Sequence, residues 1–202
     1  PLQTPSGRIE LFSEKIAGFG HADCHGHATW NLPDEWAGSA GTAFPLHLLG
    51  KQPASKLHSQ LDPGAHSRAA KIKDREAIEM NPEDAAARGI VDGDLVEVRN
   101  ARGRCLCGAV LTPELMPGVV MISTGAWFDP EDPAEGGMCR HGNPNVLAPD
   151  IPTSPLSQGP AAHSCLVEVS VFKGDPPAVR AFDPPEFTTR DDGPADGVPE
   201  QP

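Results

Sequence analysis

Apolar residues occur along this chain in short runs, and nearly every run ends at a glycine, a proline or a turn sequence. Runs of this length and punctuation are typical of β-strands rather than of long helices. The pattern predicts strands at 8–12, 44–50, 77–80, 95–100, 104–111, 119–124 and 164–172. Six or seven short strands joined by tight turns predict a mainly β fold with small helices, closed into a barrel.

One segment, Asn81 to Gly89, has the signature of a helix. Asn81 can accept hydrogen bonds from the free N–H groups of the first turn, and Pro82 suits the first helical position. Glu83 and Asp84 complement the positive end of the helix dipole. Gly89 can adopt the left-handed conformation that ends a helix. We interpret this helix as scaffold, with no chemistry implied.

The stretch 125–160 has almost no helical or strand periodicity, because proline and glycine interrupt it every few positions. Loops longer than about 15 residues are usually functional or disordered. Trp127, Phe128 and Met138 are among its apolar residues, which disordered segments usually lack. Its polar residues are mostly neutral hydrogen-bonding groups. We therefore expect a long ordered or semi-ordered loop that lies against a large polar surface that is not protein.

Composition and charge exclude several classes of function. The net charge of -12 argues against nucleic acid and against an anionic membrane surface, since both require clustered Lys and Arg. No apolar run approaches about 18 residues, so no membrane insertion is expected. The first residues contain neither an initiator Met nor a signal-peptide core, which predicts a piece of a longer protein.

The chain divides into three parts by composition. Residues 1–42 form an irregular N-terminal segment rich in Gly, His and Trp, residues 43–173 hold the predicted barrel, and residues 174–202 are expected to be an extended arm that becomes a disordered acidic end. Trp30 and Trp36 either anchor the N-terminal segment on a surface outside this chain or fill its own core. Both readings stay open at this point.

The five cysteines show no regular spacing, so we expect free and mostly buried thiols rather than a disulfide framework. A structural zinc site could be drawn from a set of Cys and His side chains, but these lack the Cys-x-x-Cys pair that zinc sites normally contain. The set comprises Cys24, His25, His27, Cys139 and His141.

A group of polar residues directly follows the apolar run at 44–50. Residues at such strand ends commonly face ligands, although an ordinary solvated loop would show the same pattern. The residues are Lys51, Gln52, Lys56, His58, Ser59 and Gln60.

Several motifs occur in an order that resembles a known family. They are TPSGRIELFSE near the start, LHSQLD at 57–62, NPEDAAARGIVDGDLVEVRNARG at 81–103, GAWFDP at 125–130 and HGNPNVLAPDIPTSPLSQG at 141–159. Together they resemble the C-terminal dinucleotide-binding domain of the molybdopterin oxidoreductases, in the branch of the dimethyl sulfoxide, trimethylamine N-oxide and biotin sulfoxide reductases. Two positions depart from the usual pattern, Ala148 and Pro152, and both should alter loop geometry more than chemistry.

The resemblance implies a double-psi β-barrel and a molybdenum ion held by two molybdopterin guanine dinucleotides in the full-length parent. It implies that this chain binds and orients the cofactor of an enzyme that reduces S-oxides or N-oxides by oxygen-atom transfer. The protein ligand of the metal, usually a serine, would come from an earlier domain. We therefore expect the chain alone to contain no catalytic residue and no metal ligand, and to have the other domains of the parent as partners. Branch members occur in both the cytoplasm and the periplasm, and free thiols slightly favour the cytoplasm.

The candidate cofactor contacts follow from this resemblance and from the chemistry of a pterin. A pterin is a flat heterocycle with alternating donors and acceptors, which neutral amide and imidazole groups match. The candidates are Lys51, Gln52, His58, Ser59, Gln60, His141, Gly142, Asn143, Asn145, Gln158 and Gly159.

Roles within this set differ, and alternatives remain for several members. Gln158 is the best single candidate for a pterin contact, whereas Lys51 and backbone N–H groups near the two glycines could meet the pyrophosphate or the pterin edge. The two histidines could instead be structural, and Asn143 and Asn145 could cap their own loop. Trp127 is expected to pack against the base of the loop. The alternative function is a protein-docking module with no cofactor role.

Overall fold

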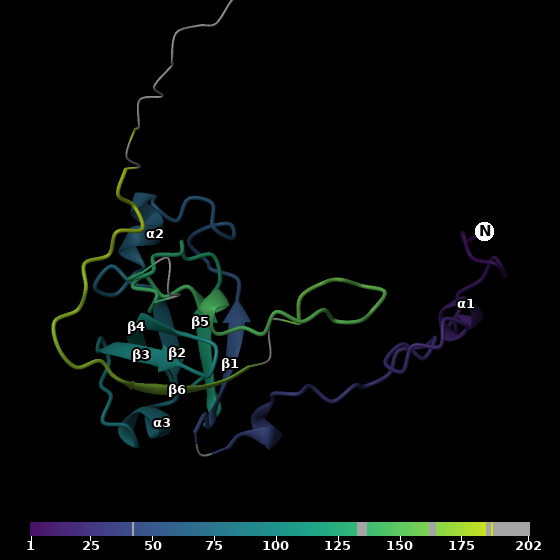
Figure 1. The fold of residues 1–202 in the computed structure, drawn as a ribbon, viewed down its shortest axis with the longest axis horizontal. Coiled ribbons are helices and arrows are strands. Elements are labelled where there is room, and N and C mark those ends of the chain that lie inside the picture. The colour runs from purple at the N-terminus through teal and green to yellow at the C-terminus, as the bar shows by residue number, and fades with distance from the viewer. Residues whose placement is uncertain (42, 133–136, 162–164, 185–186, 188–202) are drawn as a thin grey trace, which may run out of the picture.

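A closed barrel of six strands forms the centre of the computed structural model, which describes residues 1–41, 43–132, 137–161, 165–184 and 187 (Figure 1). The strands are β1 (Leu46–Lys51), β2 (Ala77–Met80), β3 (Leu95–Arg99), β4 (Arg104–Leu111), β5 (Val119–Ser123) and β6 (Cys165–Val171). The predicted mainly β fold is thus confirmed, and six of the seven expected strands are present.

The strands follow each other around the barrel in the order β1-β5-β2-β4-β3-β6. Two neighbouring pairs are parallel, β1 with β5 and β2 with β4, and the other four are antiparallel. Parallel neighbours need crossover connections, so the two halves of the chain interlock. This arrangement is a double-psi β-barrel.

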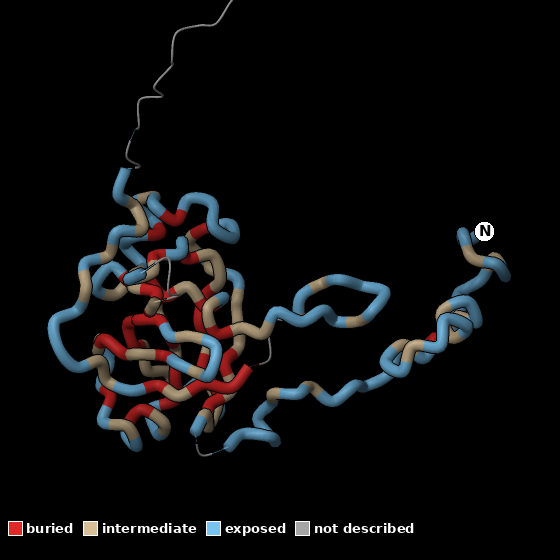
Figure 2. Tube along the Cα trace, viewed as in Figure 1, coloured by how far each residue is buried: buried red, intermediate tan, exposed pale blue. Residues whose placement is uncertain are grey.

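Alternating side chains of the strands fill the barrel. Leu48, Ile78, Val98, Ile122 and Val167 are all at most 3% exposed, and Figure 2 shows the buried residues gathered in the strands. Burying each such side chain contributes about 1.5–3 kcal/mol, so the core is the main source of stability.

The five cysteines are free, as predicted. Four of them, Cys105, Cys107, Cys139 and Cys165, are buried in the barrel, whereas Cys24 is half-buried. Burial raises the pKa of the Cys165 thiol to about 11. The buried thiols therefore act as small apolar core residues.

The described helices are short: α1 (Glu14–Ala17) and η1 (Ala37–Ser39) lie before the barrel, and α2 (Ala65–Ala69), α3 (Pro82–Ala86) and η2 (Pro144–Val146) lie between its strands in sequence. The helix predicted after Asn81 is α3, and Oδ1 of Asn81 accepts a hydrogen bond from the N–H of Glu83 at 2.8 Å. Gly89, just beyond it, has a φ of +66°. The predicted capping is therefore confirmed. None of the helices in the described part of the chain is long and apolar enough to cross a membrane.

The strand predicted at 8–12 is wrong. These residues are irregular, and Ile9 and Leu11 are 80% and 87% exposed. The alternating pattern is present in the sequence, but no strand in the described part of the chain pairs with this segment to complete the backbone hydrogen bonds that a strand requires.

Residues 1–41 leave the barrel as a long, mostly exposed arm (Figures 1 and 2). Glu35 attaches the base of this N-terminal arm to the barrel. Its carboxylate receives two hydrogen bonds from the guanidinium of Arg102 and one from the N–H of Leu166 at 2.8 Å. The arm is thus held at its barrel end and extends outward from there.

After β6 the chain returns across the end of the barrel that carries α2. The N–H of Arg180 donates to Oδ2 of Asp129 at 2.7 Å, and the ring of Phe182 packs edge-on against His141 with centroids 4.9 Å apart. The extended part of the predicted C-terminal arm is therefore docked on the barrel up to residue 184. The predicted acidic end at 188–202 lies outside the described residues.

Candidate functional site

A pocket of about 580 Å³ lies at the carboxyl ends of the parallel strands β1 and β5. We call it the loop pocket. Three segments form it: the turn after β1, the segment directly after β5, and the η2 segment. Its lining residues are His58, Ser59, Thr124, Gly125, Ala126, Trp127, Phe128, Asn143 and Asn145.

The turn after β1 has an unusual backbone. The N–H of Gln60 donates to the carbonyl of Leu57 at 2.9 Å, and between them His58 has a φ of +50°. Leu61 follows with a φ of +65°. Positive φ values are uncommon for residues other than glycine, and such strained conformations cluster at binding sites. The surrounding structure must therefore hold this turn in place.

Gly125 allows the segment after β5 to lie directly against this turn. Its φ is +88°, and a Cβ at this position would be 1.8 Å from the carbonyl oxygen of His58. The two backbones thus approach more closely than any side chain would permit.

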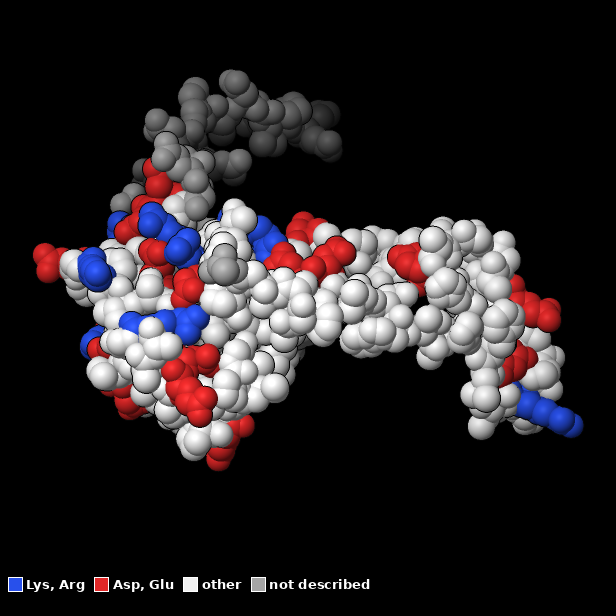
Figure 3. Space-filling view, turned by 90° about the horizontal axis from the view of Figure 1, so that it is seen from below, with Lys and Arg blue, Asp and Glu red and all other residues white. Residues whose placement is uncertain are grey.

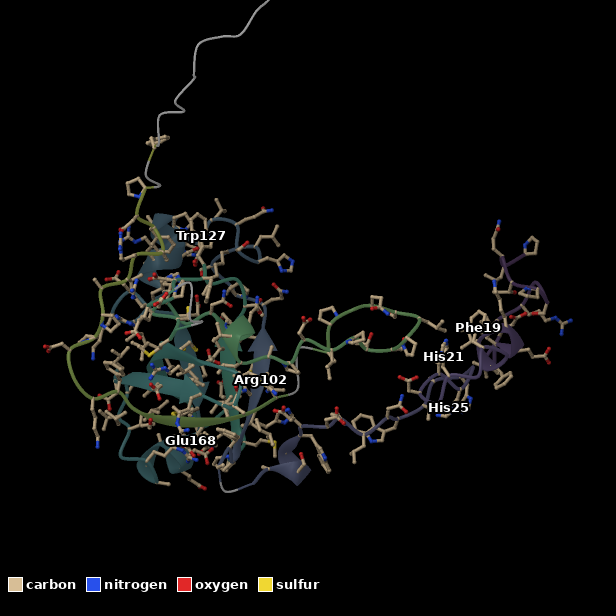
Figure 4. All side chains as sticks on the ribbon, viewed as in Figure 1. Phe19, His21, His25, Arg102, Trp127 and Glu168 are labelled. Atoms are coloured by element: carbon tan, nitrogen blue, oxygen red, sulfur yellow. The ribbon has the colours of Figure 1, made fainter. Side chains whose placement is uncertain are left out.

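Trp127 joins the same two segments through its side chain. Its Nε1–H donates to the carbonyl of Ser59 at 2.9 Å, and its ring contacts Phe182 edge-on. The side chain is still 41% exposed and lines the loop pocket. Figure 4 shows it at the end of the barrel near α2. Trp127 therefore packs the loop base, as predicted, and also presents an aromatic surface to the pocket.

Asn143 and Asn145 form the third side of the pocket. Oδ1 of Asn143 accepts a hydrogen bond from the N–H of Asn145 at 2.9 Å, so the self-capping that the sequence left open does occur. The cap does not remove either residue from the pocket, because both remain among its lining residues.

The lining has a distinct chemistry. Hydroxyl, amide and imidazole groups alternate with the aromatic surfaces of Trp127 and Phe128, and none of the described lining residues is a lysine or an arginine. Neutral groups that both donate and accept, beside an exposed aromatic ring, suit a flat polar heterocycle. The described lining lacks the cations that bind phosphate most strongly.

Four of the candidate residues thus come together: His58, Ser59, Asn143 and Asn145. Gln52 lies beside them, with its Nε2 3.5 Å from Nδ1 of His58. Gln60 is exposed at the end of the turn and does not line the pocket.

Lys51 also lies outside the lining. Its ammonium forms an ion pair with the carboxylate of Glu79 on β2, so its charge faces β2 and not the pocket.

His141 lies behind the pocket wall. It is fully buried, and its Nδ1–H donates to the carbonyl of Trp127 at 3.0 Å. Burial, and then the nearby Lys71 ammonium, lower the pKa of His141, so its ring is neutral at pH 7. Gly142 is buried beside it, where a Cβ would be 2.9 Å from Cβ of Glu76. Both residues support the wall from inside.

Gln158 and Gly159 lie in a separate place. Residues 151–161 form a hairpin that extends away from the barrel toward the N-terminal arm (Figure 1). The carbonyl of Gly159 accepts from the N–H of Thr153 at 2.7 Å, and Nε2 of Gln158 donates to the carbonyl of Pro155 at 3.2 Å. The structure therefore does not bring Gln158 to the loop pocket.

Sequence reasoning missed a buried ionic cluster beneath the pocket, made of Lys56, Asp62, Lys71 and Glu76. Both ammonium groups lie within 3.0 Å of Oδ1 of Asp62 and of Oε2 of Glu76. No periodicity marks these residues, because all four lie outside the helices and strands. The one sign of the cluster in the sequence is that Asp62 ends the LHSQLD motif and Lys56 directly precedes it.

The zinc site that the sequence allowed is not assembled. Cys24, His25 and His27 lie in the N-terminal arm, whereas Cys139 and His141 are buried in the body of the barrel. Among the residues that the structure describes, no three His, Cys, Asp or Glu side chains are grouped so that they could hold a metal ion.

Comparison with known proteins places these features in a family. A family model described as "Molydopterin dinucleotide binding domain" matches residues 46–166. The chain is 43% identical over 187 residues to a dimethyl sulfoxide/trimethylamine N-oxide reductase of Cereibacter sphaeroides, a match that covers 92% of this chain and 23% of that protein. It is 46% identical over 184 residues to a biotin sulfoxide reductase of the same organism, covering 91% of this chain and 24% of that protein.

A solved structure has the same fold. Acetylene hydratase from Pelobacter acetylenicus superposes with a TM-score of 0.67 at 19% identity, over 84% of this chain and 24% of that one. The chain spans about a quarter of the length of the curated relatives described above. On the family match and these identities, the chain belongs to the molybdopterin dinucleotide-binding domain family.

Proposed function

We propose that the loop pocket receives a heterocycle of a molybdopterin guanine dinucleotide, and that this chain is the cofactor-binding part of a molybdenum enzyme that reduces S-oxides or N-oxides. The observation that carries the proposal is the meeting of His58 and Ser59 with Asn143 and Asn145 around one pocket. Its chemistry matches the ligand class that the family name specifies. Support for the reaction comes from the named activities of the relatives.

The donor set of the pocket fits a pterin or guanine ring. Asn side chains offer a donor and an acceptor in one group, and Trp127 offers a face for stacking. Because the described lining contains no lysine or arginine, we expect the phosphates to lie outside the pocket. When bound, the cofactor supplies the redox chemistry, and the residues of this chain bind and orient it.

Two finer points belong to the same proposal. The cofactor is the bis form, with two dinucleotides on one molybdenum, and its protein ligand lies outside this chain. Gln158 and Gly159 form a second contact region for the cofactor, which is separate from the loop pocket because both residues lie on the hairpin.

The proposal is tested in the intact protein that carries this chain. Asn143→Ala and Asn145→Ala remove amides from the pocket, and Asn31→Ala removes one from the N-terminal arm as a matched control. Molybdenum content is measured by mass spectrometry, and guanine nucleotide is measured by chromatography after acid hydrolysis. We expect a loss of both in the pocket variants only. Full content in both pocket variants would refute the assignment.

The N-terminal arm supports a proposal about partners. Ile9, Leu11 and Trp30 are each at least 78% exposed, and Phe12, Phe19 and Leu32 are also exposed. On the face shown in Figure 3, charged side chains gather over the barrel, and the surface toward the arm is mostly uncharged. Monomeric proteins rarely leave large apolar patches open. We propose that the arm packs on another part of the same, longer protein.

The alternative function is a docking module for a separate protein, without a cofactor. The same exposed side chains favour it, and a binding experiment separates the two. If the purified intact protein contains stoichiometric guanine nucleotide and leaves Trp30 protected from oxidation, the arm is an internal contact. If it contains no nucleotide and retains a foreign protein through Trp30, the docking module is correct.

For location, the free state of all five cysteines favours a reducing compartment. We therefore propose the cytoplasm over the periplasm.

A further inference from the structure

Asp62 occupies a special position beneath the loop pocket. It follows the turn that carries His58 and Ser59, and its side chain is fully buried. Its two oxygens have different partners: Oδ1 receives hydrogen bonds from Lys56 at 2.8 Å and from Lys71 at 2.9 Å, whereas Oδ2 receives one from the backbone N–H of Trp127 at 3.0 Å. The Asp62 carboxylate thus contacts Lys56, directly before the turn that follows β1, and Trp127, in the segment after β5.

The contact with Lys56 closes the turn. Lys56 precedes residues 57–61 and Asp62 follows them, so their ion pair joins the two ends of a segment that contains two residues with positive φ. A conformation that is unfavourable for His58 and Leu61 is maintained only if the surrounding contacts require it. The ion pair supplies such a contact directly at the base of the turn.

The contact with Trp127 joins the turn to the segment after β5. Trp127 is held at three atoms: its N–H by Asp62, its Nε1 by the carbonyl of Ser59 and its carbonyl by Nδ1 of His141. Of these three partners, only Asp62 brings a charge, and hydrogen bonds to a charged acceptor are about twice as strong as neutral ones.

Lys71 and Glu76 complete the charge balance. The cluster contains two ammonium groups and two carboxylates. Both ammonium groups form their ion pair with Glu76 through one oxygen, Oε2. Burial alone would raise the pKa of Asp62, but the hydrogen bonds from Lys56 and Lys71 outweigh burial and lower it. Burial likewise acts to lower the pKa of Lys56, and its bonds to Asp62 and Glu76 raise it overall. Asp62 is therefore ionised at neutral pH.

We propose that Asp62 is the positioning residue of the loop pocket, which fixes the His58–Ser59 turn and Trp127 in the geometry that receives the cofactor. Asp62 does not line the pocket itself, so it acts through the residues that do. The role in cofactor loading rests on the function proposed above, whereas the role in fixing the two segments does not.

Two charge-balanced double variants test the proposal in the intact protein. Lys71→Met with Glu76→Gln and Lys71→Met with Asp62→Asn each remove one cation and one anion, and each leaves Lys56 with one carboxylate. The two differ in one respect. An amide has a single acceptor oxygen, which cannot serve Lys56 and the N–H of Trp127 from the two directions that Asp62 serves. Glu76 uses one oxygen for its lysines, so Gln can retain that role.

The first readout is hydrogen exchange at the amide of Trp127, followed by NMR or by mass spectrometry with fragmentation. We expect this amide to exchange about tenfold faster in the Asp62→Asn double variant than in the Glu76→Gln double variant, the equivalent of one lost charge-assisted hydrogen bond. The melting temperatures of the two should be similar. Equal exchange at Trp127 in both variants would overturn the proposal and leave Asp62 with a general structural role.

The second readout is the guanine nucleotide content of the purified proteins. We expect the Asp62→Asn double variant to lose several times more nucleotide than its matched partner. If exchange at the Trp127 amide differs between the two double variants but their guanine nucleotide content does not, Asp62 fixes Trp127 without a role in cofactor loading. The proposal is then wrong in that part. If the wild-type protein itself contains no nucleotide, the proposed function fails, and the exchange result still decides whether Asp62 fixes the wall.

Discussion

Gly125→Ala should destabilise the protein more than an alanine at any other glycine of similar backbone geometry. At Gly125 two unfavourable effects coincide: a φ of +88°, and a Cβ that would lie 1.8 Å from the oxygen, 2.2 Å from the carbon and 2.9 Å from the next nitrogen of the His58–Ser59 peptide. All three are backbone atoms, so no flexible side chain can move aside.

The magnitude follows from the two effects. The positive φ costs an L-residue about 1–2 kcal/mol, and overpacking against a rigid neighbour costs about 1–3 kcal/mol more. We expect a total loss of about 2–5 kcal/mol in the free energy of unfolding. Gly118→Ala is the matched control, because Gly118 has a φ of +84° and a Cβ there would meet nothing within 4 Å.

Urea unfolding of the three proteins measures the difference. With a denaturant slope of about 2 kcal/mol per M, the Gly125 variant should unfold roughly 0.5–1.5 M earlier than the Gly118 variant. The Gly125 variant should also lose cofactor, because the turn carrying His58 must move. Equal midpoints for the two variants would show that the turn does not pack on Gly125, and the geometry of the loop pocket would have to be revised.

Three further predictions concern the scaffold. Asn81→Ala removes the cap of α3 and the hydrogen bond from Nδ2 to the carbonyl of Leu115, so thermal unfolding should show a loss of about 1–2 kcal/mol. Asn81→Ser keeps a capping oxygen and should lose less. The hydrogen bond from Arg102 lowers the pKa of Glu35 below 4.5, so the stability that this pair contributes is present above pH 4.5 and is lost as the pH falls through the lowered pKa. Hydrogen exchange of the Leu166 amide, which donates to Glu35, should therefore accelerate in acid beyond its intrinsic rate. Glu35→Gln should abolish this pH dependence. Burial raises the pKa of Cys165 to about 11, whereas Cys24 is only half-buried, so iodoacetamide at pH 8 should label Cys24 first. Peptide mapping measures the two rates. Equal labelling of Cys165 and Cys24 would contradict the burial of Cys165 in the barrel core.

The barrel could be predicted from the sequence because its strands are short apolar runs separated by clear turn signals. The same reasoning failed at 8–12, where alternation exists without a partner strand. Whether a segment pairs depends on what lies beside it in the fold, and local alternation does not contain that information. The capping of α3 was predictable for the opposite reason, since Asn81 acts on backbone groups two residues away.

The site was predicted only in part. The motifs LHSQLD and HGNPN indicated His58, Ser59, Asn143 and Asn145, and the structure brings these four together. The motif containing Gln158 is continuous with HGNPN in sequence, but the hairpin at 151–161 directs it away from the pocket. The buried cluster could not be predicted, because Lys71 and Glu76 meet Lys56 and Asp62 only through the tertiary fold.

A structure of the cofactor-loaded intact protein would show whether the loop pocket holds a heterocycle of the cofactor. We expect a pterin or guanine ring within hydrogen-bond distance of the amide of Asn143 or Asn145, in the same pocket as His58 and Trp127. A loaded protein in which this pocket is filled by protein side chains, with every ring of the cofactor elsewhere, would contradict it.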